Sequence, residues 1–413
     1  MKVFKFGGAS LKDASGVRNV AAIIRSHSTE KLLVVVSAMG KTTDKLERLL
    51  EVASSKQPYQ EIFSDLTRYH LDIVNALFES PHVVHQQLDI LFRELQEALL
   101  SEQPFDQLYD HVVSKGELIS SIILHNYLVS QNLSAHWHDA RMSICTDNSF
   151  REGKVDWSES ALCIEKLKSV LDQHIVITQG FIGKTREGFT TTLGREGSDF
   201  SAAIFASCLN AEAVVIWKDV PGVMNSDPKR IREATVFEEL PFKEAAEMTY
   251  YGASVIHPKT IKPLANKGIP LYVKNFTDPT LPGTKIHECK VDQLPPLIVF
   301  KTNQCLISCK VTDYTFISEE QLGIIFHALS SLDIRLNMMQ NSAISLSFCV
   351  DFRESKMTKL IENLQHHFEV FYNTGLTLIT IKNYDEATYN EYRNMKGVLL
   401  EQSSRSTLQV LVK

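Results

Sequence analysis

The segment LLVVVSA, residues 32–38, decides the fold class, because its aliphatic side chains follow one another without a polar break until Ser37. Successive side chains of a strand point to opposite faces, so such a run is typical of a strand covered on both sides. The segments HIVITQG (174–180), AVVIWKD (213–219) and IPLYVKN (269–275) have the same character. We therefore expect a sheet buried between two layers of helices.

Helical patterns separate these strands. In QQLDILFRELQEALL (86–100), leucines recur at helical spacing at positions 88, 91, 95 and 99. Strands that alternate with helices favour a three-layer α/β/α domain with a mostly parallel sheet. Residues 40–130 are almost wholly helical in pattern, so part of this region should form a helical lobe over the sheet.

Length and composition limit the class of protein. The chain has 413 residues, more than one core usually serves, so two or three domains are expected. Its net charge of −6, without any block of like charge, argues against a nucleic-acid or anionic-membrane partner. Because no signal-peptide pattern and no apolar stretch of membrane-spanning length occurs, we expect a cytoplasmic enzyme or sensor. The seven cysteines are scattered without a Cys-x-x-Cys, so neither a disulfide framework nor a protein-bound metal is expected.

The last part of the chain contains a weak internal repeat, which follows a predicted linker at 287–297. LISCK (306–310) is similar to LITIK (378–382), and QNSAISLSFCV (340–350) is similar to QSSRSTLQVLV (402–412). Each copy predicts a strand, a helix and a polar turn that enters a second strand. Two small α+β modules are therefore expected, suited to binding a small ligand twice or to dimerisation.

Two glycine-containing segments are candidates for anion binding. In VFKFGGAS (3–10), Gly7 and Gly8 follow a strand and could present backbone N–H groups to a phosphate that Lys5 would also reach. A tight turn with a solvated lysine explains this segment equally well. In TTTLGREGSDFSAAIFA (190–206), Ser198 or Asp199 is expected to cap a helix whose start favours anions.

Three charged residues in such segments have a structural and a functional interpretation. Arg195 offers a planar fork for a carboxylate, or is simply a surface residue beside a capped helix. Asp219 follows a strand at the sheet end where ligands bind, or caps a turn. Glu117, in SKGELIS (115–121), is by itself a first-turn carboxylate favoured by the helix dipole.

Taken together and in order, the segments resemble the aspartate kinases of the amino-acid kinase family. The resemblance covers roughly residues 2–285, and the paired ACT-type regulatory region of that family is similar to the duplicated tail. It implies a catalytic domain at 1–286 and two ACT-like modules at 298–413. The motifs that carry it are KFGGAS, VVVSA, GELIS, TQGFIG, TTTLGREGSD, DVPGVMNSDP and EAAEMTYYGASVIHP.

The resemblance implies transfer of the γ-phosphoryl of ATP to the side-chain carboxylate of L-aspartate, with Mg²⁺ bridging the phosphates. Such chemistry needs two anions brought together and their charge neutralised. Lys5 and Asp199 would be catalytic, and the nucleotide would contact Lys5 and the residues Gly7, Gly8, Asp219 and Lys229. Aspartate would contact Thr43, Glu117, Arg195, Ser198 and Asp199.

Several positions depart from the family pattern. Glu196 stands where relatives usually carry glycine, so its charge is expected to point away from the phosphates. Met224 and Ser254 replace residues that often contact the nucleotide, which leaves the adenine contacts open. Ala343 stands where lysine-inhibited relatives often carry glutamate, so lysine, threonine or no effector is compatible with the tail.

The leading hypothesis is a dimeric aspartate kinase, joined through its tail and regulated by an amino acid. One alternative is an amino-acid kinase that acts on a glutamate-type substrate. Another is a non-catalytic amino-acid sensor built on a kinase scaffold. The presence of both phosphate-binding and carboxylate-binding residues, Lys5 and Arg195 among them, argues against the sensor.

Overall fold

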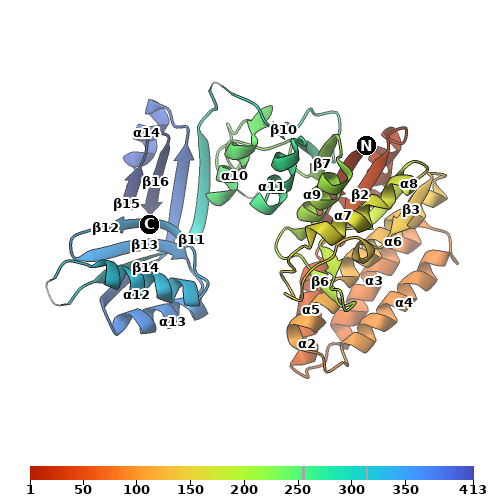
Figure 1. Cartoon of the computed structure of the whole chain (residues 1–413), viewed down its shortest axis with the longest axis horizontal. Coiled ribbons are helices and arrows are strands. Elements are labelled where there is room, and N and C mark those ends of the chain that lie inside the picture. The colour runs from red at the N-terminus through yellow and green to blue at the C-terminus, as the bar shows by residue number, and fades with distance from the viewer. Residues whose placement is uncertain (254–255, 292, 313–314) are drawn as a thin grey trace. The chain divides into compact units, whose positions relative to one another are not determined.

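The computed structural model describes residues 1–253, 256–291, 293–312 and 315–413 (Figure 1). The chain forms two compact units. The first comprises Met1–Val223, Val236–Ala246 and Val255–Lys290, and the second comprises Met224–Thr235, Glu247–Ser254 and Val291–Lys413. The domain boundaries suggested at residues 286 and 298 stay predictions. None of the helices within the described ranges is long and apolar enough to cross a membrane.

An eight-stranded sheet is the centre of the first unit, in the order β3-β4-β2-β1-β7-β9-β10-β8. Its neighbours pair in parallel except β9 and β10, as a mostly parallel sheet requires. The strands are β1 (Lys2–Phe6), β2 (Leu32–Val36), β3 (Ala135–His138), β4 (Ile175–Gln179), β7 (Ala213–Lys218), β8 (Glu239–Pro241), β9 (Leu271–Asn275) and β10 (Thr284–His287).

Burial along the strands explains the layers. All five residues of β2 are buried, and the same holds for β4, so both faces of the sheet are covered there. The predicted strand at 269–275 is partly different, because alternate residues of β9 are half exposed. Among the helices, α6 packs against β2, β3 and β4, whereas α9 packs against β1, β2 and β7. The predicted α/β/α architecture is confirmed.

The helices of the first two-thirds of the chain include the expected lobe at 40–130. Within it, leucines of α2, α3 and α4 share one buried cluster with residues of α5. A short hairpin, β5 (Ile182–Lys184) and β6 (Thr190–Thr192), precedes α9. The helices are η1 (Gly8–Leu11), α1 (Ala14–Ser26), α2 (Thr42–Ser54), α3 (Gln60–Leu77), α4 (Val83–Ala98), α5 (Phe105–Val113), α6 (Lys115–Ser130), η2 (Ala140–Met142), α7 (Trp157–Glu165), α8 (Leu167–Leu171), α9 (Gly197–Leu209), α10 (Phe242–Tyr250) and α11 (Pro258–Lys267).

The second unit is built on one six-stranded antiparallel sheet, in the order β12-β13-β11-β14-β16-β15. The predicted repeat is confirmed by the pairing, because β13 pairs with β11 as β16 pairs with β14. Its elements are β11 (Leu297–Lys310), α12 (Glu319–Ser331), β12 (Leu336–Asn341), β13 (Ser345–Asp351), α13 (Glu354–Gln365), β14 (Glu369–Lys382), α14 (Glu386–Arg393), β15 (Val398–Ser403) and β16 (Thr407–Val412).

The two modules share their central strands. β11 and β14 pair along their whole length, with Val299 opposite Thr380 in one module and Ser308 opposite Phe371 in the other. Register shifts between Lys301 and Leu306 mark the passage from one half to the other. Each half therefore completes its sheet with a strand segment from the other copy, so neither module is expected to fold alone.

All seven cysteines are free. Cys305, Cys309 and Cys349 are buried in the second unit, as expected for small apolar residues. The remaining four, in the first unit, are only partly buried. One of these four belongs to a cluster of metal-ligand side chains that is taken up below.

Candidate active site

Lys5 occupies the end of the central strand β1, where it meets two other charged side chains. Its Nζ lies 2.6 Å from Oδ1 of Asp199, and the two side chains are only 10% and 5% exposed. Lys218, the last residue of β7, places its Nζ 3.7 Å from Oδ2 of the same carboxylate. Two cations thus share one buried anion, and the trio has a net charge of about +1 when all three groups are ionised.

The ionised state of Asp199 follows from this arrangement. Burial alone would raise its pKa, but Lys5 and Lys218 together lower the pKa below the usual range. The carboxylate therefore stays charged and holds both ammonium groups at the ends of two adjacent strands. Parallel strands place their carboxyl ends at one edge of the sheet, where ligands of open α/β folds bind.

The Gly7–Gly8 turn lies directly beyond Lys5. A Cβ added to Gly8 would lie 2.5 Å from the carbonyl oxygen of Ala38 and 2.8 Å from that of Gly40, so no larger residue fits without moving backbone. At Gly7 the backbone is extended, and an added Cβ would come no nearer than 3.6 Å, to Nζ of Lys5. Gly8 is therefore required by packing, whereas Gly7 leaves open space beside the lysine ammonium group.

Glu117 is a buried carboxyl group in the first turn of α6. Its Oε1 accepts a hydrogen bond from the backbone N–H of Ala38 at 3.2 Å, and its Oε2 has no partner among the described residues. Burial raises the pKa of Glu117 to about 8, although the Ala38 hydrogen bond and the nearby Lys5 oppose the rise. An unpaired buried carboxylate oxygen is costly, and a ligand ammonium group would relieve that cost.

The loop that carries Arg195 is fixed at both ends. On one side, the buried Asp110 accepts hydrogen bonds from the backbone N–H and hydroxyl of Thr192, at 2.9 and 2.6 Å. On the other side α9 begins at Gly197, with Glu196 as its N-cap. The cap predicted at Ser198 or Asp199 is therefore wrong, because both residues lie one to two positions inside the first turn.

Positions within this loop differ in exposure. Arg195 is exposed and forms no ion pair with any residue that the structure describes. Ser198 is buried where α9 approaches Gly180, at which an added Cβ would come within 2.5 Å of Ser198 Cβ. Glu196 adopts φ 56° and ψ 25°, a left-handed conformation that favours glycine. A glycine at this position would adopt the same conformation without a steric cost from a Cβ.

The remaining predicted residues are Thr43, Asp219 and Lys229. Thr43 is partly buried in the first turn of α2, beside Thr42, whose hydroxyl is 3.2 Å from Nε2 of His70. Asp219 is exposed and follows Lys218 directly. Lys229, whose backbone N–H donates to the Asp227 side chain, belongs to the second unit.

The sequence left the adenine contacts open at Met224 and Ser254, and the structure describes only the first of these residues. Met224 is partly buried and begins a segment of the second unit, Met224–Thr235. Ser254 lies outside the described residues. The roles assigned to Lys229 and Asp219 toward a nucleotide stay predictions.

Lys218 is the residue that sequence reasoning missed. It stands beside Asp219 in AVVIWKD, and only Asp219 was predicted to contact the nucleotide. The pairing of β7 with β1 places Ile216 opposite Lys5 and Trp217 opposite Phe6, so Lys218 is next in line at the Gly7 turn. The available signal was a lysine at the carboxyl end of a buried strand. A charged side chain is rarely buried without a partner, so its position suggests a polar site.

Comparisons with known proteins identify the family. Residues 1–275 match the model of the amino acid kinase family. Lysine-sensitive aspartokinase 3 of Escherichia coli is 32% identical over 394 residues, covering 92% of this chain and 86% of that protein. Aspartokinase 1 of Arabidopsis thaliana is 30% identical, over 88% of this chain and 66% of that protein. The chain spans only 42% of a bifunctional aspartokinase/homoserine dehydrogenase of the same plant.

Solved structures agree. E. coli aspartokinase III in complex with aspartate and ADP has a TM-score of 0.84 at 29% identity, covering 100% of this chain and 96% of that one. The same enzyme with lysine and aspartate also scores 0.84, at 28% identity and the same coverage. Family model, relatives and structures converge, and this chain belongs to the aspartokinases of the amino acid kinase family.

Proposed function

We propose that the protein catalyses ATP-dependent phosphorylation of the side-chain carboxylate of L-aspartate to 4-phospho-L-aspartate, a first step toward lysine, threonine and methionine. The observation that carries the proposal is the buried Asp199 shared by Lys5 and Lys218 beside the Gly7–Gly8 turn. This arrangement supplies fixed positive charge where two anions must meet. Phosphoryl transfer depends mainly on such positioning and charge neutralisation.

The phosphoryl group would be held by the chain's own cations and backbone. Lys5 and Lys218 would neutralise the transferring group, while Gly7 and Gly8 would offer N–H donors beside it. Asp199 would keep both ammonium groups in place. The start of α9, at Gly197, would add the positive end of a helix dipole.

Aspartate would be recognised by one buried and one exposed group. The α-ammonium would pair with Glu117, whose Oε2 lacks a partner among the described residues. A carboxylate of the substrate would form an ion pair with the guanidinium of Arg195, which is exposed on its anchored loop. Thr43 and Ser198 would line the same space. The E. coli structure with aspartate and ADP supports this substrate and a nucleotide.

Magnesium fits a site of this kind when it arrives with the nucleotide. Among the described residues around Lys5, no three His, Cys, Asp or Glu side chains converge as a ligand set. Mg²⁺ is commonly bound by phosphates, waters and at most one or two carboxylates, and Asp219 is the exposed carboxylate nearest in sequence to Lys218. Asp219 would help to hold the metal, which would supply positive charge against the phosphates.

The tail would regulate and dimerise the enzyme. An amino-acid effector is supported by the E. coli structure with lysine, although Ala343 offers no carboxylate for an effector amine. We keep both lysine and threonine as candidate effectors. A homodimer is supported by the first half of β14, whose outer edge pairs with no described strand and exposes Phe371 and Tyr372 by 54% and 55%. A cytoplasmic location stays a prediction from the sequence.

Trapping with hydroxylamine tests the reaction. The purified full-length protein is incubated with Mg·ATP and, separately, with L-aspartate, L-glutamate, N-acetyl-L-glutamate or no amino acid. An acyl phosphate reacts with hydroxylamine to a hydroxamate, and we expect this product from aspartate alone. A hydroxamate from a glutamate-type substrate, or none with any acid, would contradict the proposal.

A further inference from the structure

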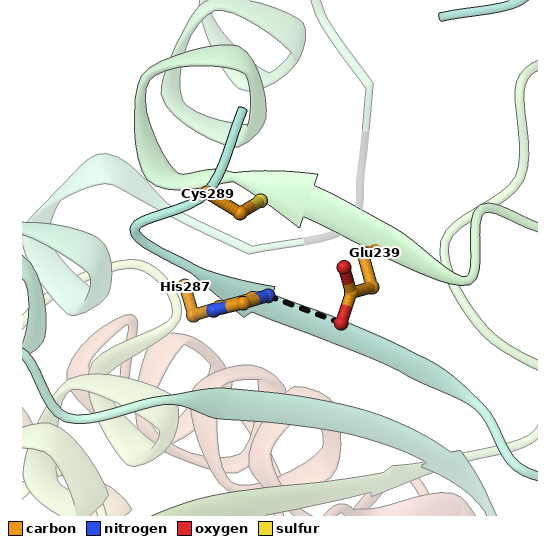
Figure 2. A group of neighbouring side chains, drawn as sticks. All are labelled: Glu239, His287 and Cys289. Atoms are coloured by element: carbon orange, nitrogen blue, oxygen red, sulfur yellow. Dashed lines mark ion pairs between the residues drawn. The ribbon is translucent and has the colours of Figure 1, made fainter. Parts of the chain in front are cut away.

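Glu239, His287 and Cys289 form a cluster of metal-ligand side chains in the first unit. One ligand atom from each lies within 4.8 Å of the other two, and Figure 2 shows the side chains pointing toward a common space. Nε2 of His287 is 3.3 Å from Oε1 of Glu239, with the two side chains 22% and 53% exposed. Glu239 opens the edge strand β8, and His287 closes its neighbour β10.

Strand geometry, rather than flexible surface side chains, brings these groups together. β8 and β10 pair in parallel, with Glu239 opposite Lys285 and Pro241 opposite His287. Side chains two positions apart lie on the same face of a strand, so Glu239 and His287 are diagonal neighbours on one face. Cys289 lies beyond the end of β10, two residues after His287.

We propose that Glu239, His287 and Cys289 bind a zinc ion. A carboxylate oxygen, an imidazole nitrogen and a thiolate sulfur are the donors that Zn²⁺ takes in proteins. Three protein ligands leave a fourth position for water in a tetrahedral site. Mg²⁺ and Ca²⁺ are poor alternatives, because they take oxygen ligands and the cluster offers only one oxygen-bearing side chain.

The charges around the cluster are compatible with a bound dication. A dication would offset the negative charge of the Glu239 carboxylate, whereas Lys285, opposite Glu239 on β10, would oppose it.

The site lies away from the catalytic end of the sheet. β10 runs antiparallel to β9, and Ile286 pairs with Leu271, the first residue of β9. The cluster is therefore level with the beginnings of the parallel strands, whereas Lys5 and Lys218 lie near their ends. A zinc ion there would tie the edge strand β8 to the segment that follows β10. Its role would be to stabilise the fold rather than to take part in phosphoryl transfer.

The test uses cobalt as a spectroscopic substitute for zinc in the full-length protein. After treatment with a chelator, the protein is titrated with Co²⁺ and followed by absorption. We expect one equivalent to produce a thiolate-to-cobalt charge-transfer band with tetrahedral d–d bands, and Zn²⁺ to displace it. C289S should abolish the charge-transfer band, and H287A and E239Q should each weaken binding by at least about tenfold.

Matched variants separate this site from other thiols and from unfolding. C163S changes another partly buried cysteine, whose thiol interacts with Cys145, and should leave the spectrum unchanged. E239Q alters a half-exposed side chain, so its circular dichroism should match that of the wild type. Zinc should raise the melting temperature of the wild type and not of C289S. Persistence of the band in C289S, or the absence of stoichiometric Co²⁺ binding by the wild type, would overturn the proposal.

Discussion

At the scale of single residues, the site depends on buried charge that is only partly compensated. Asp199 satisfies two lysines, whereas Glu117 keeps one carboxylate oxygen without a partner among the described residues. The first arrangement is complete without a ligand. In the proposed function a ligand cation would complete the second, so we expect the protonation of Glu117 to be coupled to substrate binding.

The pKa of Glu117 predicts the pH dependence of aspartate binding. Because the pKa of this carboxyl is raised to about 8, the group is mostly neutral in the free enzyme at pH 7 and pairs with an ammonium group only after losing its proton. The KM for aspartate should therefore fall as pH rises from about 6 to about 8. In Glu117→Gln this dependence should disappear, and KM at pH 8 should rise roughly tenfold or more.

Protein stability gives an independent measurement of the same carboxyl group. The native protein retains this proton between the ordinary pKa of 4.5 and about 8, whereas the unfolded chain has released it. A raised native pKa means that stability falls as pH rises through this window. Without ligand, Glu117→Gln should therefore melt at a higher temperature than the wild type at pH 8, but not at pH 5. Equal melting at pH 8 would contradict the raised pKa.

Glu196 is a second residue whose conformation has an energetic consequence. The left-handed backbone of Glu196 costs about 1–2 kcal/mol for a residue with a Cβ. A glycine avoids this cost, but its unfolded state has more conformational entropy, which offsets part of the gain. Glu196→Gly should raise the free energy of unfolding by about 0.5–1 kcal/mol, measured by urea denaturation. Glu196→Ala keeps the strain and serves as the control. An equal gain in both variants would assign the effect to the side chain instead.

At the scale of elements, the turn between β1 and η1 positions Lys5 and the backbone N–H groups of Gly7 and Gly8, which we propose contact the phosphates. Gly8→Ala would push a Cβ into the carbonyl oxygens of Ala38 and Gly40, which are backbone atoms with little freedom to move. We expect a loss of about 1–3 kcal/mol in stability and a large loss of activity. Denaturation and steady-state kinetics would measure both.

Gly7→Ala is the matched control for this turn. Its backbone is extended and its nearest neighbour is Nζ of Lys5 at 3.6 Å, so stability should be nearly unchanged. If the Gly7 N–H contacts the phosphates, the added methyl group should still raise the KM for ATP. A stability loss equal to that of Gly8→Ala would refute the packing argument.

At the scale of the whole molecule, the shared sheet of the tail predicts how two chains associate. The outer edge of the first half of β14 exposes backbone groups together with Phe371 and Tyr372. Replacing both residues by lysine should convert a dimer into a monomer without destabilising the chain, because both side chains are more than half exposed. Light scattering after gel filtration would measure the mass.

Phe105→Lys is the control for the association experiment. This phenylalanine is 44% exposed on α5 in the first unit, so the substitution changes surface charge without touching the tail. The control should remain dimeric. A dimer that persists in the Phe371→Lys, Tyr372→Lys double variant would exclude this edge as the interface.

The fold could be predicted where the signal is local. Strands buried on both faces, such as β2, are evident in sequence because every side chain must be apolar. The edge strands β12 and β15 were missed, since only one residue of each is buried. The sharing of β11 and β14 between modules could not be predicted, because hydrophobic pattern indicates that a strand exists but not which strand it pairs with.

The same limit applies to the candidate site: residues in local motifs could be predicted, whereas residues brought together by strand pairing could not. Lys5, Glu117 and Asp199 were identified through motifs and come together around one charged centre. Lys218 was missed because its role depends on the pairing of β7 with β1. The Glu239–His287–Cys289 cluster has no sequence signature, since Glu239 lies far along the chain from the other two residues and the three are of different types.

We propose that Lys5 neutralises the phosphoryl group as it moves, and steady-state kinetics of Lys5→Ala would measure this contribution. A contact that strengthens in the transition state affects kcat, so kcat should fall roughly 10²–10³-fold. The KM for aspartate should change less than about threefold. Lys2→Ala, on the same strand and in an ion pair with Glu30 whose side chains are 33% and 35% exposed, should leave both constants unchanged. A raised KM with unchanged kcat would contradict the account.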